Sequence, residues 1–473
     1  MKIIRLYLFI LMLLLTGCLK GVLDPTALAP ASPQSSWVKA DKSILITSKY
    51  CEAIIPENLQ NENLSLAELI DIGLLNNPNT KATWAEAKSK AASYGQSLSK
   101  YFPEIDVEGS YEKERSSNVL PGFSQTFNQT TYTPEVNITY TVFDFGKIKN
   151  TSIAARQALY FADLTHNRQI QSVIKTIMDD YYNLELQKAE LLALDKDLDT
   201  ATTTLDAAFV KFESGAGSID DITQARTNYL QTKINFIEQK KAIQFSYASL
   251  INNIGLPANI EISIEKFPEE VSTDIILTSV DSLITEAQTN RPDLLASEAN
   301  LEENQANLNL AKSQFFPTIT ADFDLGKDYY QKHHQEDFHY TFLLKLKFPL
   351  FKGFYDKNEV VKQKANFAKA KANLQKMELE VIKEVTNSHF SVKIASETLK
   401  YTKEYLETAN KRYDIAILKY KAGLNDILDV LSAQSFLQDA RKKYVQGKKE
   451  WYSSIADLAY STGTICKCEK TRT

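Results

Sequence analysis

Hydrophobic and polar residues alternate along four short segments of the chain. The first, residues 104–111, sets Ile, Val and Tyr against Glu, Asp and Ser. The same period of two runs through residues 135–142, 318–325 and 341–348, with Leu343 as the exception. Such alternation predicts strands of a sheet that has one apolar face and one polar face.

This sheet fits two environments equally well. A half-buried sheet of a soluble α+β domain has this pattern, and so have the strands of a membrane β-barrel. Four strands cannot close a barrel around a channel. A membrane sheet would therefore need strands from several chains, because open strand edges are not tolerated in lipid.

Each strand pair is followed by a helical pattern of 67 residues, at Lys147–Glu213 and at Tyr355–Lys421. At 1.5 Å per residue, each helix would be about 100 Å long. Apolar positions recur every three or four residues, which is typical of a coiled coil. The two stripes keep one register: Leu191, Leu194, Leu198, Ala201, Leu205, Ala208 and Phe212, then Leu399, Thr402, Leu406, Ala409, Tyr413, Ala416 and Tyr420. Shorter helices are expected at residues 80–101, 217–254, 297–315 and 425–462.

The chain is internally duplicated. "VKFESGAGSIDDI" begins at Val210 and "LKYKAGLNDILDV" at Leu418, 208 residues later. Asn-Pro at 77–78 and Arg-Pro at 291–292 each precede a Phe-Pro by 25 residues. Two copies of a unit of roughly 200 residues explain this order.

The duplication sets the expected boundaries. The repeats are predicted at residues 63–260 and 277–464, joined by a linker at 261–276. Gly215 and Gly423 end the long helices, where a left-handed C-cap residue is needed.

Composition and motifs argue against several function classes. A net charge of −5, without a basic stripe, does not favour a nucleic-acid partner. No Ser/His/Asp set or Gly-rich phosphate loop is evident, so we expect no enzyme activity and no cofactor. His166 and His389 are isolated, whereas His333, His334 and His339 cluster. The cluster could bind metal, but a solvated loop is favoured and no metal ligand is assigned.

The N-terminus predicts export. Lys2 and Arg5 precede a short apolar run that ends in Leu-Thr-Gly before Cys18. This arrangement resembles a bacterial lipoprotein signal at residues 1–17, with Cys18 acylated and residues 18–62 forming a tether. An ordinary signal peptide or a buried apolar helix are the alternatives. No later stretch is apolar for long enough to predict a transmembrane helix.

Three other cysteines remain: Cys51, and Cys466 and Cys468 in a tail at residues 465–473. A disulfide from Cys51 to one tail cysteine is possible in an oxidising compartment. A Cys-Lys-Cys metal clip lacks a nearby histidine, and unpaired thiols stay open as a third alternative.

With these landmarks, the chain resembles the TolC family of outer-membrane efflux ducts. The resemblance rests on the duplicated Pro spacing, on "VFDFG" and "PLFKG" after the strands, and on the turns "KFESGAG" and "KYKAGLN". The segment "DILDVLSAQ" is among the more specific matches. The match covers residues 60–464 in both halves, and with Cys18 acylated the chain looks like the lipoprotein branch of the family.

The resemblance implies an α+β membrane protein that assembles as a homotrimer. Three chains would combine their strands into a twelve-stranded outer-membrane β-barrel and their long coiled-coil helices into a periplasmic α-barrel. The polar strand faces would line the lumen. Loops at residues 113–131 and 327–339 would face outward, and the tether would wrap the waist of the barrel.

The resemblance also implies site residues. Asp429 matches the first acidic position of the family's constriction, and Asp221 is its counterpart in the first half. The second acidic position falls on Ser432, so the existence of a second ring stays open, with nearby Asp426 as a substitute that is not favoured. Asp429 also suits a helix start, where the dipole favours a carboxylate. The turns at Gly215 and Gly423 would dock a periplasmic adaptor.

The resulting hypothesis is an outer-membrane channel of a tripartite efflux system, a passive conduit served by an adaptor and an inner-membrane pump. A periplasmic coiled-coil scaffold or adhesin is the alternative. An adaptor subunit fits less well, because it would need one helical hairpin rather than two duplicated ones.

Overall fold

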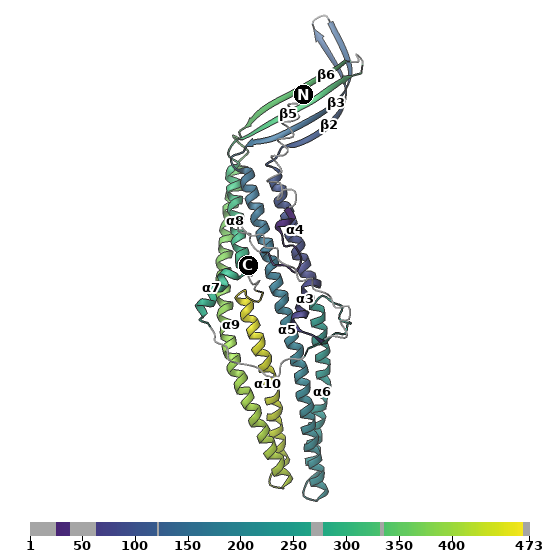
Figure 1. Cartoon of the computed structure of the whole chain (residues 1–473), viewed down its shortest axis with the longest axis vertical. Helices are drawn as coiled ribbons and strands as arrows, with labels where there is room; N and C mark the ends of the chain where they lie inside the picture. The colour runs from purple at the N-terminus through teal and green to yellow at the C-terminus, as the bar shows by residue number, and fades with distance from the viewer. Residues whose placement is uncertain (1–24, 38–62, 121–122, 266–277, 332–334, 467–473) are drawn as a thin grey trace, which may run out of the picture. The chain divides into compact units, whose positions relative to one another are not determined.

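The computed structural model describes residues 25–37, 63–120, 123–265, 278–331 and 335–466 (Figure 1). Predictions about Cys18, Cys51, Cys468, His333 and His334 lie outside these residues. The helices are η1 (Pro25–Leu28), α3 (Leu66–Asn76), α4 (Pro78–Ser99), α5 (Lys147–Glu213), α6 (Ile219–Asn253), α7 (Val280–Asn290), α8 (Pro292–Ser313), α9 (Tyr355–Lys421) and α10 (Ile427–Ser461). The strands are β1 (Asn63–Leu64), β2 (Glu104–Leu120), β3 (Phe123–Phe143), β4 (Ser263–Ile264), β5 (Thr318–Tyr330) and β6 (Gln335–Lys347).

The chain folds into two compact units, and each takes segments from both repeats. The first unit contains residues 1–31, 86–163 and 296–375, and with them the four long strands. The second contains residues 32–85, 164–295 and 376–473, and with them the helical hairpins α5–α6 and α9–α10. No helix in the described ranges is both long and apolar enough to cross a membrane.

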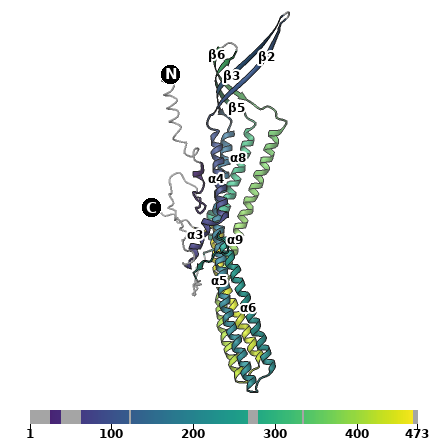
Figure 2. The same cartoon turned by 90° about the vertical axis from the view of Figure 1, so that its right-hand side faces the viewer.

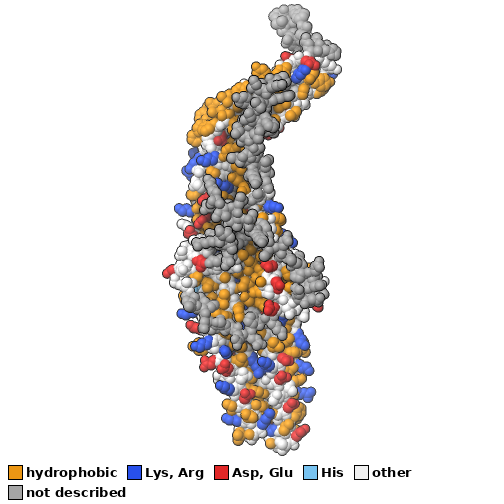
Figure 3. All heavy atoms as spheres, viewed as in Figure 1, with side chains coloured by type: hydrophobic (Ala, Val, Ile, Leu, Met, Phe, Trp, Pro, Cys, Tyr) orange, Lys and Arg blue, Asp and Glu red, His pale blue; other side chains and the backbone are white. Residues whose placement is uncertain are grey.

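The first unit is built on one antiparallel sheet in the order β2-β3-β5-β6. Its register puts Ile105, Ile138, Phe323 and Phe342 in one row across all four strands. Apolar side chains gather over these strands in Figure 3, and those of the edge strands β2 and β6 are exposed. The four predicted strands are confirmed.

The predicted loops at residues 113–131 and 327–339 are wrong, because most of both segments is strand. β2 and β3 stay paired past Lys113 and Thr130 as far as Leu120 and Phe123. In these segments polar residues occupy both faces, so alternation of polarity stops. The backbone hydrogen bonds of an antiparallel ladder do not need that alternation, and the pairing continues.

The two long helices are confirmed with the expected bounds, since α5 and α9 each contain 67 residues. In the second unit, α5, α6, α9 and α10 lie together as two hairpins (Figures 1 and 2). Small residues of the predicted stripes are buried between them, including Ala208 and Ala416. The stripes differ clearly at their last shared position: Tyr420 is 0% exposed, whereas Phe212 is 43% exposed.

Two short helices were not predicted. α3 and α7 each have 11 residues and precede the Asn-Pro and Arg-Pro landmarks. A capping box starts α3, with Ser65 and Glu68 each accepting from the other's backbone N–H. This pairing satisfies donors that a helix start leaves open. The short strands β1 and β4, also unexpected, pair in parallel.

The Pro landmarks have a structural explanation that both repeats share. Asn77 Nδ2 donates to the Asn253 carbonyl at the end of α6, at 2.8 Å. Arg291 Nη1 donates likewise to the Ser461 carbonyl at the end of α10, at 3.2 Å. Each residue thus caps a helix end that has unpaired carbonyls. The following glycine, Gly255 or Gly463, has a positive φ.

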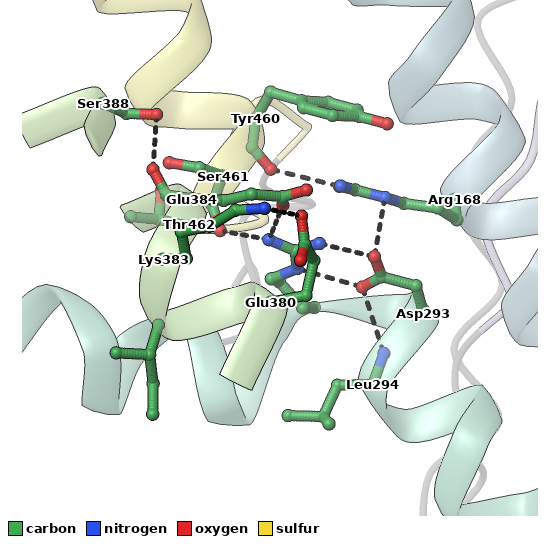
Figure 4. A network of polar contacts seen from close by, with 12 residues as sticks. Arg168, Asp293, Leu294, Glu380, Lys383, Glu384, Ser388, Tyr460, Ser461 and Thr462 are labelled. Carbon is green, nitrogen blue, oxygen red and sulfur yellow. Dashed lines mark hydrogen bonds and ion pairs between the residues drawn. The ribbon is translucent and has the colours of Figure 1, made fainter. Parts of the chain in front are cut away.

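In the second repeat, the residue that caps the helix end is charged and forms ion pairs. Arg291 is 1% exposed and forms ion pairs with Asp293, at 2.6 Å, and with Glu384, at 2.5 Å. Figure 4 shows Asp293 beside Arg168, whose Nε is 3.3 Å from Asp293 Oδ2. The guanidinium carbon of Arg168 lies 3.7 Å from the ring centroid of Tyr460. Burial alone would raise the pKa of Asp293, but the two arginines outweigh it and hold that pKa below its usual value.

Part of the predicted tether is described. In the first unit, Ala29 packs with Ala87 and Ala91 of α4. In the second unit, Trp37 is held by Asn167 of α5 through two hydrogen bonds of 2.6 Å, one from the Trp37 N–H and one to its carbonyl. The amide side chain pairs with the backbone as a neighbouring strand would. A wrap around several copies stays a prediction.

Candidate gating site at the two helical turns

The turns at the ends of α5 and α9 have the same backbone geometry. Gly215 has φ +74° and Gly423 has φ +77°. Ala216 N donates to the Lys211 carbonyl at 3.0 Å, and Leu424 N donates to the Lys419 carbonyl at 2.9 Å. These are six-to-one bonds of a Schellman C-cap, which requires a left-handed residue at the glycine position.

The helices that follow also start alike. Ser218 caps α6 and accepts from Asp221 N at 3.2 Å. Asp426 caps α10 and accepts from Asp429 N at 3.0 Å. Asp221 and Asp429 therefore occupy the same position of the first helical turn, where the helix dipole favours a negative charge.

The two aspartates differ in what they contact across the hairpins. Asp221 Oδ2 accepts a hydrogen bond of 3.0 Å from the Tyr420 hydroxyl of α9. Lys211 Nζ lies 4.0 Å from the centroid of the Tyr420 ring. Burial raises the pKa of Tyr420 well above its usual value, and the bond to Asp221 adds to the rise. The side chain of Asp429 is exposed.

The bond between Asp221 and Tyr420, which we call the tyrosine latch, thus ties one hairpin to the other. A hydrogen bond to a charged group contributes about 1.5–3 kcal/mol. The latch links α6 to α9 close to the two turns.

Further ties lie along the same two hairpins. Arg441 of α10 forms a buried ion pair with Asp197 of α5. Burial raises the pKa of the Asp197 carboxyl, although Arg441 opposes the rise. Tyr413 of α9 donates to the Thr200 carbonyl of α5 at 3.2 Å. These contacts make the hairpins of one chain a single packed group.

Sequence reasoning found the turns but missed these ties. Tyr420 and Tyr413 were placed on the inner stripe, as the structure confirms. Their hydroxyl partners were not predicted. An aromatic stripe residue that carries a hydroxyl was the available signal, because a buried Tyr O–H usually has a partner.

The remaining site predictions stay untested. His339 is on β6, with Nδ1 3.4 Å from Asp328 Oδ2. Within the described ranges, no group of three or more His, Cys, Asp or Glu side chains is arranged to hold a metal ion. Cys466 is half-buried against the core of the second unit. Cys51, the other half of the possible disulfide, and Cys468, the other half of the possible metal clip, lie outside the described residues.

Comparison with known proteins agrees with this geometry. The profile of the family described as "Outer membrane efflux protein" matches residues 69–256 and 283–464. The chain is 22% identical to nodulation protein T of Rhizobium leguminosarum bv. trifolii, over 96% of this chain and 95% of the relative. It is 20% identical to outer membrane protein TolC of Salmonella enteritidis, over 86% and 83% of the two chains.

The fold is also that of a solved structure, the outer membrane protein VceC from Vibrio cholerae. The TM-score is 0.75 at 18% identity, and the superposition covers 84% of this chain and 96% of VceC. The likeness establishes the architecture of long helical hairpins with a small sheet.

These observations define a class, the TolC-like channels of the outer membrane. The chain belongs to the outer membrane efflux protein family. It is a transport protein of the outer membrane with a large periplasmic part, and the members of its family are channels.

Proposed function

We propose that three copies of this chain form a passive duct that carries small molecules out of the cell. An inner-membrane pump would load the duct through a periplasmic adaptor. The chain would bind no cofactor and catalyse no reaction, since driving force comes from the pump.

The sheet is the observation that carries this proposal. Among the described residues, its outer strands β2 and β6 each leave one edge unpaired. Its apolar face is exposed, with Val107 and Leu346 at 79% and 66%. Open edges are not tolerated in lipid, so the edges of one copy would pair with those of the next. Three four-stranded sheets give a twelve-stranded barrel.

The strand lengths support a membrane barrel. β5 and β6 each have 13 residues, and a tilted membrane strand needs about 9–11. The polar face carries Asp322 and Asp324 on β5, and Lys345 on β6. That face would line a water-filled lumen.

The two turns would form the periplasmic mouth. Gly215 and Gly423 leave the surface open, because no atom lies within 4 Å of where a Cβ would be. A smooth tip suits the docking of adaptor hairpins. Asp429, exposed near the tip, would form a ring of three carboxylates that narrows the resting mouth and attracts cations.

Asp221 would have a different role from the one that its sequence position implied. Its carboxylate already accepts from Tyr420 at 3.0 Å. It would therefore serve the closed state as a latch partner, and Asp429 alone would supply the constriction charge.

Purified protein in detergent and planar bilayers tests the proposal. Native mass measurement should give three chains, and the bilayer should show discrete conductance with cation preference. Asp429→Ala should reduce the cation preference and the block by multivalent cations, without changing the mass. A protein that is soluble as one chain without detergent would instead be a periplasmic scaffold.

The lipid anchor is proposed on the sequence alone. Cys18→Ser should abolish incorporation of labelled palmitate, because the acylated thiol is lost. The barrel would still hold the variant in the outer membrane if the signal is cleaved. Palmitate labelling that persists in the variant would overturn the anchor.

A further inference from the structure

The polar face of the four-stranded sheet carries its charges in two separate zones. Near the helices, Lys345 lies opposite Thr320, and Lys347 lies opposite Thr318. The next rows away from the helices contain no lysine or arginine on this face of the described strands. Their ionisable side chains are carboxylates and one histidine: Glu104 and Asp322, then Asp106 and Asp324, then Glu108, Glu135 and His339, and then Asp328 and Asp337. We call the two parts the basic zone and the acidic zone.

Further lysines gather at the basic zone. Lys147 is the first residue of α5, and its Nζ donates to the Thr318 hydroxyl at 2.7 Å. The same Nζ donates to the Phe316 carbonyl at 3.0 Å. Lys347 and Lys352 lie close enough to Lys147 for their charges to repel it. The start of α5, the end of β6 and the turn before α9 thus bring their lysines together.

Two carboxylates at this end do not cancel the charge. Asp144 accepts from two backbone N–H groups at the start of α5, where the helix dipole is positive. Asp356 is buried and pairs with Lys352 at 3.1 Å. Lys345 is exposed on the polar face. Four lysines (147, 345, 347 and 352) against two aspartates leave the basic zone with a positive net charge.

The acidic zone holds like charges directly opposite one another. Glu108 on β2 pairs in register with Glu135 on β3, and Asp328 on β5 pairs with Asp337 on β6. Like charges at such positions destabilise a sheet. His339 stands beside them, with Nδ1 3.4 Å from Asp328 Oδ2. The folded sheet accepts this repulsion and so keeps a negative potential along its polar face.

We propose that these zones give the β-barrel two filters of opposite charge in series, which pass neutral and zwitterionic small molecules and hinder small ions of either sign. This inference rests on the proposed duct, whose lumen the polar face would line, and it names the class of solute that the duct carries. Three copies would repeat both zones around one axis, so each zone becomes a ring. Rings of acidic or basic side chains select the sign of the ions that pass.

The order of the two rings decides what each solute meets. An anion that enters from outside is repelled by the acidic ring before it reaches a lysine. A cation gathers at the acidic ring but is opposed by the basic ring behind it. A neutral or zwitterionic molecule has no net charge for either ring to repel. The fields reach about 8 Å at physiological ionic strength and about 30 Å at 0.01 M, so the filters act most strongly in dilute salt.

Cysteine labelling from outside intact cells tests the filters. In a background whose only other cysteine is Cys18, Thr139→Cys reports on the acidic zone and Thr320→Cys on the basic zone. A cationic and an anionic methanethiosulfonate of similar size are applied in buffered sucrose at 0.01 M ionic strength. Each rate is divided by the rate for a small free thiol. The cationic reagent should then react about tenfold faster than the anionic one at Thr139→Cys, and this ratio should be about tenfold lower at Thr320→Cys.

Charge variants link this difference to the named side chains. Lys345→Gln with Lys347→Gln should raise the ratio at Thr320→Cys toward that at Thr139→Cys. Glu104→Gln with Asp322→Asn, which flank position 139, should lower the ratio there toward that of the free thiol. In 1 M salt the fields reach only about 3 Å, and the two positions should give nearly equal ratios.

The apolar face separates failure of the filters from failure of the duct. Ile138→Cys is next to Thr139 but on the face proposed to meet lipid, and neither reagent should label it. Equal ratios at Thr139→Cys and Thr320→Cys in dilute salt, with Ile138→Cys protected, would overturn the filters and leave the duct standing. If Ile138→Cys reacts as fast as Thr139→Cys, the sheet does not line a membrane duct, and both proposals are wrong.

Discussion

The two helical hairpins show what duplication keeps and what it changes. α5–α6 and α9–α10 have helices of 67 and 35 residues, the same glycine turn and the same position for an acidic residue. Their outward contacts differ. Tyr420 is buried on Asp221, whereas Phe212 at the same register is exposed. The backbone geometry of the two hairpins is preserved, and side-chain changes make their contacts unequal.

The largest loss of stability is expected where Asn77 and Arg291 cap the ends of α6 and α10. Arg291→Ala should leave Asp293 and Glu384 without their buried partner, at a cost on the order of 3 kcal/mol. Asn77→Ala removes two neutral hydrogen bonds at the matching position, one to the Asn253 carbonyl and one from Asn79 N, and should cost about 2 kcal/mol. Thermal unfolding of the purified protein would measure both.

Arg291→Lys is the matched control for charge. Lysine keeps the positive charge but cannot reach two carboxylates and a carbonyl with a planar fork. Its melting temperature should fall between those of wild type and Arg291→Ala. Equal losses for Asn77→Ala and Arg291→Ala would show that the charged network adds nothing to the shared cap.

A smaller effect that depends on pH is expected at Asp163 of α5. The side chain is buried and neither oxygen has a partner among the described residues, whereas its repeat equivalent Lys371 is exposed. Burial raises the pKa of Asp163 to about 8. The folded protein therefore holds a proton that the unfolded chain releases, and this contribution to stability is lost as pH rises toward 8.

Asp163→Asn removes this titration while it keeps the shape of the side chain. The variant should gain melting temperature over wild type at pH 8 and gain less at pH 5. Asp195→Asn, at an exposed position of the same helix, should show no such difference. A gain for Asp163→Asn that is equal at both pH values would contradict the assignment.

The sequence predicted the repeat, the four strands and the bounds of both long helices, because each rests on a regular period. It did not predict the extended β2–β3 hairpin, where Ser116, Ser117 and Asn118 give no alternation. Nor did it predict the partner of Asp221. Tyr420 comes 199 positions later, and only the packing of four helices brings the two together.

The tyrosine latch permits a pair of opposite changes. Tyr420→Phe removes the hydroxyl that donates to Asp221. The closed state should lose about 1.5 kcal/mol, which shifts the equilibrium between the closed and open states roughly tenfold. Resting conductance in planar bilayers should rise. Phe212→Tyr places a hydroxyl on α5 at the repeat position equivalent to Tyr420, where Asp429 of α10 is the counterpart of Asp221, and resting conductance should fall.

Asp429→Ala separates the two explanations of a Phe212→Tyr effect. If the new hydroxyl bonds to Asp429, the double variant should lose the fall in conductance that Phe212→Tyr produced. An effect of Phe212→Tyr that persists without Asp429 would place the added tyrosine against some other group.

The smallest difference is expected at the two glycines, where the hairpins are most alike. Gly215→Ala and Gly423→Ala would each force a side chain into a left-handed backbone, with φ +74° and +77°. No atom lies within 4 Å of either added Cβ. The cost is therefore conformational and should be the same at both turns, about 1 kcal/mol each. Melting temperatures of the two variants should agree. Asparagine, which tolerates this conformation, should recover part of the loss at both turns. A much larger loss at one turn would mean that the C-cap conformation matters more there, and that the hairpins differ in backbone as well as in side chains.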